Sequence, residues 1–400
     1  MKRLTVLFLA ALLLCLPACS AQDKTVTLTD AYTIICPEDA DTNITQAALL
    51  LQTFLKEKCG IAVNTTSVES KTAIRLALSD KLADGQYRMR IDKESVVIEA
   101  KTSDALLLGM RKIRTALYNT FVLEQETPAA PVITTELCAS LSGTINMAEA
   151  PFSVLTQNMK NSDMDDGGTI EERAIRFDKL IAEFQPDVIN TQESNHKKWQ
   201  AAYETMLFDV YDRYPANGEL STRPNTILYR RDRFELQDAG TFYLSDTPDV
   251  PSSLPETKHV RMCTWVLLKD RITGDTVMIC NTHIDNSADE LRVQQTKILT
   301  EQLKDEIAAY PLCVTGDFNG NYLSDIYLAA AEVLNDPHLN KDINFSEYAY
   351  TWSAVAKNYQ RRLDFCFHND LLKPVYYRIL TDGYDGVISD HYGVLTEFTS

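Results

Sequence analysis

The chain has 400 residues, 45% of them hydrophobic and 24% charged, which is the composition of an ordinary globular protein. Because a single core seldom grows past about 250–300 residues, this length predicts two domains. The net charge of −17 excludes strong sequence-blind affinity for nucleic acid, which depends on a basic surface, but leaves open a nuclease whose site is locally positive.

The first 19 residues predict an export signal. Lys2 and Arg3 precede an apolar run over 4–16, which is too short to span a bilayer. The Leu-Pro-Ala-Cys sequence that ends at Cys19 resembles the lipobox of bacterial lipoproteins. This resemblance implies lipid attachment at Cys19 and a location at the outer membrane or cell surface. Cleavage near Ala21, giving a free secreted protein, is the alternative.

Residues 24–122 predict a small α+β domain. We expect strands at 32–35, 73–78, 87–91 and 96–100, and amphipathic helices at 45–58 and 103–117. This layout, with Gly-Gln-Tyr-Arg-Met-Arg-Ile at 85–91 and Leu-Gly-Met at 108–110, resembles the N-terminal domain of hexosaminidase- and glucuronidase-type glycoside hydrolases. A packing role without a ligand is the simpler expectation, and a glycan partner is the alternative.

Residues 123–150 contain prolines, scattered Ser and Thr and little periodicity, which predicts a linker. Residues 151–400 then alternate strands and helices, which predicts an α/β core. The expected helices cover 170–184, 288–307 and 324–334. The expected strands cover 152–155, 188–191, 226–229, 263–268, 277–281, 312–314, 363–367 and 394–398.

The cysteines after Cys19 form no Cys-x-x-Cys pair, and several lie in strand-like runs. We expect buried thiols rather than a zinc site. A Cys36–Cys59 disulfide is the alternative in an exported protein.

Short polar islands lie at the ends of the apolar segments in the last 250 residues. They occur at 156–158, 192–193, 281–283, 316–319, 362–364 and 389–391. Together they supply carboxylates, amides and two histidines, which are the groups needed to bind a hard divalent cation and to move protons around a phosphate ester.

These islands follow the order seen in the endonuclease/exonuclease/phosphatase superfamily. The resemblance spans 152–398 and is most specific in Gly-Asp-Phe-Asn at 316–319 and Ser-Asp-His at 389–391. It implies a four-layer α/β sandwich, in which two packed mixed β-sheets are flanked by helices, preceded here by the small α+β domain. It also implies an active site at one mouth of the sandwich, where strand ends converge.

The resemblance assigns the metal to Glu193, assisted by Asn158 and Asp390. The expected ion is Mg²⁺, with Mn²⁺ or Ca²⁺ as alternatives. A carboxylate at a strand end is costly to bury without a partner, and a cation is such a partner. Magnesium keeps several waters and takes few carboxylates, which suits so sparse a site.

The resemblance also assigns the proton-transfer groups. His391 is expected to bond Asp364 and to act as general base or phosphate contact, because a carboxylate on one ring nitrogen raises the basicity of the other. Asp317 would orient or deprotonate water. Asn319, two residues on and on the same side of an extended segment, would donate to phosphoryl oxygens.

His283 is expected to face the phosphate as general acid or donor. In deoxyribonuclease-like members a Glu supports this histidine, but Arg223, Pro224 and Asn225 stand at the matching place here. Glu219 or Asp285 is the candidate substitute. Arg261 and Arg292 are candidate phosphate contacts, because a guanidinium binds phosphate in a bidentate manner.

The sequence therefore predicts a monomeric, metal-dependent phosphoester hydrolase, most readily a phosphodiesterase. Nuclease, sphingomyelinase-like and phosphatase activities share these islands. The alternative is a non-catalytic surface lipoprotein with a glycan-binding front domain and a degenerate phosphoesterase scaffold.

Overall fold

The structure is a computed structural model that describes residues 24–123, 130–215, 225–353, 360–381 and 383–400. The expected signal segment with Cys19, part of the expected linker, and Glu219 lie outside the described residues. No helix within the described ranges is both long enough and apolar enough to cross a bilayer.

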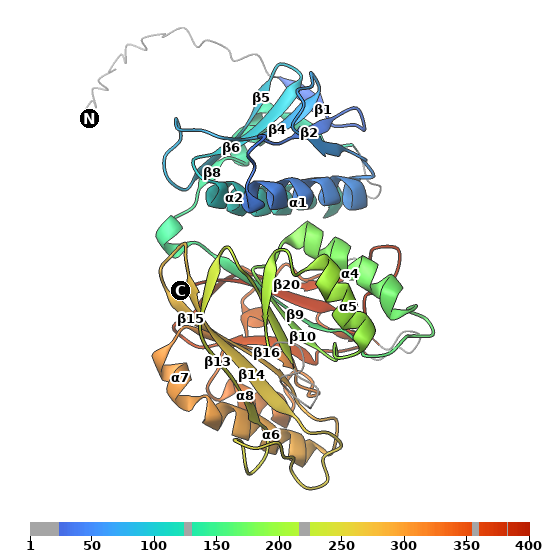
Figure 1. Ribbon diagram of the computed structural model, residues 1–400, viewed down its shortest axis with the longest axis vertical. Coiled ribbons are helices and arrows are strands. Elements are labelled where there is room, and N and C mark those ends of the chain that lie inside the picture. Colours follow the sequence, from blue (N-terminus) through green and yellow to red (C-terminus); the bar gives the residue numbers. More distant parts are fainter. Residues whose placement is uncertain (1–23, 124–129, 216–224, 354–359, 382) are drawn as a thin grey trace, which may run out of the picture.

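The front domain is a mixed sheet with two long helices against one face (Figure 1). Helix α1 (Thr42–Cys59) begins at Asp41, whose side chain accepts the Ile44 amide hydrogen, and ends at Gly60 in the left-handed conformation. Helix α2 is Ser103–Tyr118. The strand order is β3-β2-β4-β6-β5-β8. The first five of these are β2 (Thr33–Ile35), β3 (Asn64–Thr66), β4 (Ala73–Leu78), β5 (Gln86–Asp92) and β6 (Ser95–Ala100).

The prediction of a linker over 123–150 is wrong for residues 132–144. Strand β7 (Val132–Thr134) pairs with β1 (Thr25–Thr27), and β8 (Gly143–Thr144) pairs with β5. Helix α3 (Thr135–Ser140) lies between them, capped by the Thr134 side chain. Two short strands and a six-residue helix are too brief to produce a recognisable hydrophobic period, which is why the pattern resembled a linker.

The rear domain contains two packed sheets. The six-stranded sheet has the order β11-β12-β10-β9-β21-β20, and the five-stranded sheet has the order β13-β14-β15-β16-β19. The first comprises β9 (Phe152–Asn158), β10 (Val188–Gln192), β11 (Tyr211–Tyr214), β12 (Thr226–Arg230), β20 (Lys373–Leu380) and β21 (Gly393–Thr399). The second comprises β13 (Phe234–Tyr243), β14 (Met262–Asp270), β15 (Thr276–His283), β16 (Leu312–Asp317) and β19 (Asp364–His368).

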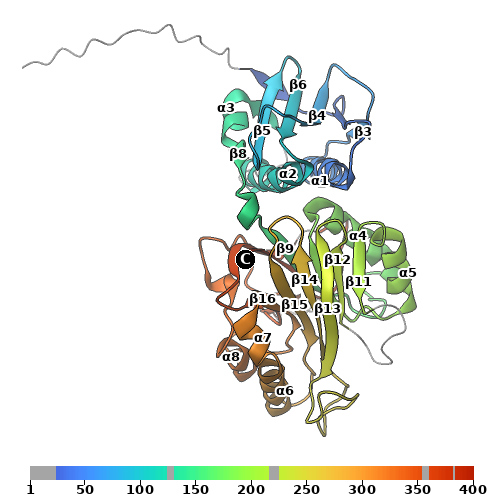
Figure 2. The ribbon, with the colours of Figure 1, turned by 60° about the vertical axis from the view of Figure 1, so that its left-hand side comes forward.

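Three apolar clusters define four layers, as predicted. Phe152, Ile279 and Phe398 belong to the cluster between the sheets. A second cluster joins the six-stranded sheet to α4 (Ile170–Phe184) and α5 (Lys197–Met206), and a third joins the five-stranded sheet to α6 (Asp289–Gln302) and α8 (Asp325–Ala331). Figure 2 shows the strands between these two groups of helices. The helix expected at 288–307 is divided into α6 and α7 (Lys304–Ala309).

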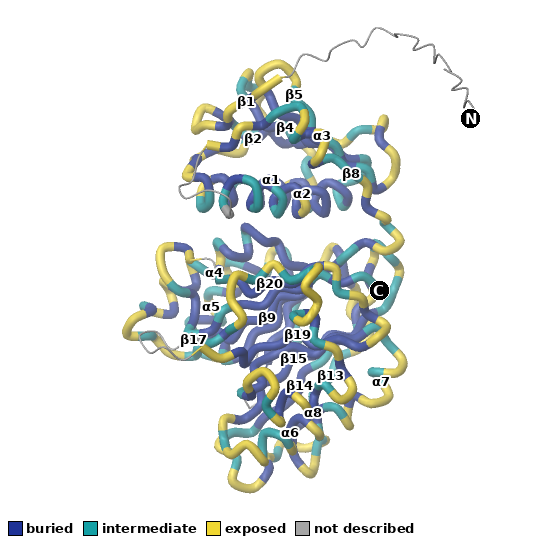
Figure 3. Tube along the Cα trace, turned by 180° about the vertical axis from the view of Figure 1, so that it is seen from behind, coloured by how far each residue is buried: buried dark blue, intermediate teal, exposed yellow. Residues whose placement is uncertain are grey.

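The two domains meet through α1 and α2, most of whose residues are buried (Figure 3). Arg111 of α2 donates to both oxygens of Asp187 at 2.6 and 2.9 Å. Arg114 donates to Glu183, which also accepts from Tyr384. All four charged side chains are at most 8% exposed. The front domain therefore supplies cations for buried carboxylates of the rear domain.

Candidate active site

Strand register brings the polar islands together. In the five-stranded sheet His283 is opposite Asp317, and Asp317 is opposite Asp364. In the six-stranded sheet Asn158 ends β9 beside Gln192, so Glu193 follows at the same edge. Because these strand ends converge at one mouth of the sandwich, residues more than 200 positions apart line one pocket.

This pocket has a volume of about 430 Å³. Its walls contain Glu193, Arg261, His283, Asp317, Asn319, Asp390 and His391 from the predicted set. They also contain Lys160, Asn225, His259, Asn286, Trp352, Arg361 and Leu363. Asn225 is the described residue of the 223–225 segment, where the resemblance leads one to expect the supporting Glu, and its side-chain amide donates to the carbonyl of Met262. Leu363 lies within the 362–364 island. The remaining added residues lie outside the islands, in irregular segments or in the short pairing of β17 (Trp352–Ser353) with β18 (Gln360–Arg361), so no periodicity identified them.

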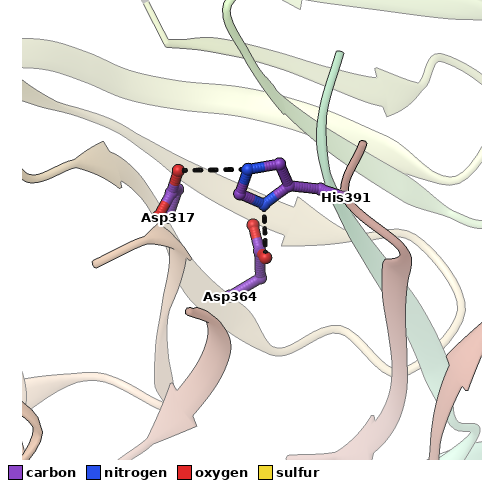
Figure 4. Close-up of side chains that lie close together, drawn as sticks. All are labelled: Asp317, Asp364 and His391. Atoms are coloured by element: carbon purple, nitrogen blue, oxygen red, sulfur yellow. Dashed lines mark hydrogen bonds and ion pairs between the residues drawn. The ribbon is translucent and has the colours of Figure 1, made fainter. Parts of the chain in front are cut away.

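His391 lies between two carboxylates (Figure 4). Its Nδ1 is 2.8 Å from Asp364 Oδ2, as predicted, and its Nε2 is 3.8 Å from Asp317 Oδ2. The side chain of Asp364 is fully buried. The hydrogen bond to Asp364 fixes the imidazole so that Nε2 is directed to the pocket side.

Burial and charge set the pKa values of this pair. Burial alone would lower the pKa of His391, but the carboxylates of Asp364 and Asp317 outweigh it and raise the pKa to about 10. Burial raises the pKa of Asp317 to about 7, and the nearby Asp364 charge adds to this effect while His391 opposes it. At neutral pH the imidazolium form of His391 is therefore favoured, and Asp317 is close to its titration midpoint.

Asn158 connects the Glu193 carboxylate to this pair. Its Nδ2 donates to Glu193 Oε1 at 3.2 Å and to Asp317 Oδ2 at 3.0 Å, while its Oδ1 accepts from the backbone of Lys160. In this orientation the amide links two carboxylates through nitrogen, and metal ligation by Asn158 would require the amide to turn. Glu193 and His391 thus lie in one hydrogen-bonded and ionic chain.

The donor set on the Glu193 side fits a hard divalent cation. Within the part of the chain that the structure describes, each carboxylate oxygen of Glu193 accepts one N–H hydrogen, from the Asn158 side chain and from the Asn161 backbone at 3.4 Å, so lone pairs remain for a metal. Asp390 lines the same pocket, 3.5 Å from the ammonium group of Lys160. Glu193 and Lys160 both have positive φ, 52° and 53°, a backbone conformation that is rare outside functional sites and tight turns.

Asp317, Asp364 and His391 also present donor atoms within 4.8 Å of one another. Within this trio, His391 Nδ1 and Asp364 Oδ2 are already bonded to each other. This hydrogen bond occupies donor atoms of the trio, whereas the Glu193 oxygens keep lone pairs for a cation.

His283 and Asn319 lie on the opposite wall. His283 Nε2 is 3.2 Å from Asn319 Nδ2 and 3.4 Å from Asp317 Oδ2. Asp285 is a candidate to replace the Glu that supports this histidine in deoxyribonuclease-like members, but the contacts of its carboxylate are with other groups. Its carboxylate accepts the backbone amides of Lys258 and His259 and lies 3.5 Å from Arg261 Nε, so it orients Arg261 instead.

The two predicted phosphate contacts differ. Arg261 lines the pocket, and burial lowers its pKa, with Asp285 opposing this effect. The prediction for Arg292 is wrong in this arrangement, because its guanidinium donates to the Asn319 carbonyl and to Asp289. Arg292 holds the 316–319 loop from outside the pocket. Sequence could not distinguish these roles, since both arginines lie next to a polar island.

Several island residues are structural. Gln192 donates to Asn281 at 2.7 Å and to Thr156 at 3.0 Å, and Asn281 donates to the carbonyls of Thr191 and Thr226. These side chains are fully buried. They form hydrogen bonds between the two sheets just beneath the pocket, because a buried amide must be paired.

Comparisons with known proteins match the front and rear domains separately. A profile described as the endonuclease/exonuclease/phosphatase family matches residues 155–391, and one described as glycosyl hydrolase family 20, domain 2, matches residues 16–127. A search of the curated proteins gave no significant match.

Solved structures similar to this chain include three from Bacteroides. An endonuclease/exonuclease/phosphatase family protein of Bacteroides thetaiotaomicron is 26% identical, with a TM-score of 0.55, over 63% of this chain and 98% of that chain. A mannosyl-6-phosphatase of the same organism is 26% identical, with a TM-score of 0.55, over 62% and 99%. An endonuclease/exonuclease/phosphatase of Bacteroides vulgatus is 25% identical, with a TM-score of 0.56, over 62% and 98%.

Proposed function

The chain belongs to the endonuclease/exonuclease/phosphatase family, and we propose that it is a magnesium-dependent phosphoester hydrolase in which Asp317 activates water and the His391–Asp364 pair contacts the phosphate. The observation that supports this proposal is the continuous chain from Glu193 through Asn158 and Asp317 to His391 in one pocket. Carboxylates for a cation and groups for proton transfer are thereby within reach of one phosphate.

The pKa directions assign the roles. Asp317 is the base that accepts the proton of the attacking water, because its pKa lies near neutral pH. His391, held as imidazolium, donates from Nε2 to a phosphoryl oxygen. His283, Asn319 and Arg261 bind the remaining oxygens or the leaving group. A magnesium ion at Glu193, Asp390 and a turned Asn158 amide would neutralise charge on the phosphoryl and leaving oxygens.

A substrate panel tests the proposal. Purified protein is assayed with Mg²⁺, and again with EDTA, on bis-nitrophenyl phosphate, nitrophenyl phosphate, plasmid DNA, sphingomyelin, inositol phosphates and mannose 6-phosphate. We expect EDTA-sensitive hydrolysis of at least one ester. The diester is the substrate predicted from the sequence. Hydrolysis of none would favour the non-catalytic scaffold.

A second candidate substrate is a small phosphorylated sugar. One structural neighbour is a mannosyl-6-phosphatase, and the pocket wall contains Trp352 with the Arg361 guanidinium 6.0 Å from its ring centroid. An aromatic ring beside polar groups suits the apolar face and hydroxyls of a hexose. Trp352→Ala would then lower kcat/KM for mannose 6-phosphate by about tenfold, roughly 1.4 kcal/mol. Tyr348→Ala, at an exposed aromatic outside the pocket, is the control. Equal effects of both would contradict this candidate.

Export, a lipid anchor at Cys19, a monomeric state and a glycan partner for the front domain remain proposals from the sequence. Mass spectrometry of protein extracted from a bacterial host tests the anchor, because a diacylglyceryl group on Cys19 changes the mass of the N-terminal peptide.

A further inference from the structure

Thr351 makes hydrogen bonds to both segments that carry the His391–Asp364 pair. The residue is fully buried and directly precedes the two-residue strand β17 (Trp352–Ser353). Its Oγ1 accepts the backbone amides of Leu363 and Asp364, each at 3.0 Å. Its carbonyl accepts the amide of Tyr392 at 2.6 Å, and its own amide donates to the Arg361 carbonyl at 3.0 Å.

These contacts matter because the pair spans two sheets. Asp364 begins β19 in the five-stranded sheet, whereas His391 precedes β21 in the six-stranded sheet. The side-chain bond between them therefore depends on how the two strand ends are held relative to each other. Thr351 is hydrogen-bonded to both ends, and Trp352 forms a β-bridge with His391.

The hydroxyl of Thr351 has a specific task. The Leu363 and Asp364 amides, which donate to this hydroxyl, lie at buried positions. A hydroxyl oxygen has two lone pairs, one for each of these hydrogen bonds. Without that oxygen both N–H groups lose their partner, and a buried unpaired donor is costly enough to move the backbone. Such a movement would shift the Asp364 carboxylate away from His391.

We propose that Thr351 is a positioning residue for the His391–Asp364 pair. Its hydrogen bonds to the backbone amides at 363, 364 and 392 hold the two side chains within bonding distance of each other. The proposal rests on the function proposed above for that pair. Thr351 does not line the pocket among the described residues, so it acts through Asp364 and His391 and does not touch the substrate.

The test compares two substitutions of the same chemistry. Thr351→Val removes the hydroxyl that pairs the amides. Thr396→Val, in β21, removes a buried hydroxyl that has no hydrogen-bond partner among the described residues. We expect Thr351→Val to lower kcat by about tenfold or more with KM changed less than about twofold, because a small misplacement of a catalytic group reduces turnover more than binding. Thr396→Val should keep the wild-type kcat and KM. Thr351→Ser, which keeps the hydroxyl, should have a kcat close to that of the wild type.

Two outcomes would overturn the proposal: equal kcat for Thr351→Val and wild type, or no rescue by Thr351→Ser. If Thr351→Val does not fold, Thr351→Ala and Thr351→Ser decide it at a temperature where both are folded, and equal kcat for these two rejects the role.

A crystal structure of Thr351→Val separates this proposal from the proposed function. We expect the Asp364 Oδ2 to His391 Nδ1 distance to exceed hydrogen-bond length, and an unchanged distance of 2.8 Å would reject positioning. This measurement is decisive even if the wild-type protein hydrolyses none of the esters tested.

Discussion

Asp317 is the residue at which the two halves of the site meet. It is bonded by Asn158 on the metal side, lies 3.4 Å from His283, and lies 3.8 Å from His391. Burial raises the pKa of its carboxyl group to about 7, with His391 opposing this effect and Asp364 adding to it. A carboxylate in this position can exchange a proton near neutral pH, as a base for water requires.

Removing a functional group from the hydrogen-bonded chain between Glu193 and His391 should abolish most of the turnover. Glu193→Ala, Asp317→Ala and His391→Ala are each expected to lower kcat on the best ester by about a hundredfold or more, on the order of 2.7 kcal/mol in the barrier. Glu235→Ala, which removes an exposed carboxylate paired with Arg271, is the control and should keep full rate. Full activity in any of the three site variants would reject the role given to that residue.

Asp364 controls the protonation of His391. The pKa of His391 is about 10 because two carboxylates outweigh burial, whereas an unfolded histidine titrates near about 6.5. The folded pKa is the higher one, so this pairing stabilises the fold fully below about pH 6.5 and is lost as pH rises through about 10. In Asp364→Asn we expect the His391 pKa to fall by more than about one unit, measured by NMR titration of the metal-free protein. An unchanged titration would mean that Asp364 does not set the charge of His391.

At the scale of elements, the strand ends decide the site, and β16 is central among them. Gly316, which directly precedes Asp317, has a φ of 145°. A Cβ atom on Gly316 would lie 2.0 Å from the carbonyl oxygen of Thr282 in β15. The close approach of these parallel strands sets Asp317 beside His283. A glycine at 316 is therefore required by space as well as by backbone conformation.

Gly316→Ala should be strongly destabilising. The new methyl group overlaps backbone, which cannot move without separating β15 from β16, so we expect a loss of about 3 kcal/mol or more in unfolding free energy. Gly274→Ala is the matched control, because Gly274 also has positive φ but no atom within 4 Å of its Cβ position, and it should cost only about 1–2 kcal/mol. Chemical denaturation measures both, and equal losses would contradict the crowding argument.

At the scale of the whole molecule, the front domain is joined to the catalytic domain by buried charge. Asp187 stands directly before β10, the strand that leads to Glu193, and its carboxylate is bonded by Arg111 of α2 and by Arg233. Glu183 is paired in the same way with Arg114. A buried carboxylate that loses its cation is costly, so the catalytic domain depends on the front domain for stability.

Arg111→Met tests this dependence. It keeps side-chain volume but leaves part of the Asp187 charge uncompensated, and we expect a loss of about 3 kcal/mol in unfolding free energy. The control is Arg75→Met, the same change in the same domain, at an arginine whose partner Glu69 is exposed, with an expected loss below about 1 kcal/mol. If both variants unfold at the same denaturant concentration, the interface is not held by this pair.

The same cluster predicts sensitivity to acid. Burial would raise the pKa of Asp187, but the guanidinium groups of Arg111 and Arg233 outweigh it and hold the pKa far below the usual range. The folded pKa is the lower one, so the stabilisation is present above about pH 4 and is lost as pH falls below it. We expect the Tm of Asp187→Asn to be lower at pH 7 and to change less between pH 5 and pH 3 than the wild-type Tm. Parallel Tm curves would exclude Asp187 as a source of acid sensitivity.

The sequence by itself determined the architecture of the rear domain and the identity of the family. Long periodic segments such as 170–184 and strand runs such as 312–314 depend on local burial patterns, which survive without knowledge of the fold. The order of the islands marked Glu193, Asp317 and His391 as one set. Short elements escaped, including α5, β11 and the β7–α3–β8 segment of the expected linker, because they contain too few residues to show a period. The longer strands β13 and β20 also escaped; both lie at sheet edges.

Only the tertiary structure decided what each polar residue does. Gln192 and Asn281 resemble site residues in the sequence but bond each other between the sheets, and Arg292 supports a loop rather than facing the pocket. Trp352, Arg361 and Thr351 gain their roles from contacts across two sheets. The physical reason is that hydrogen-bond partners and the direction of a side chain depend on strand register and sheet packing, which bring together residues far apart in the chain.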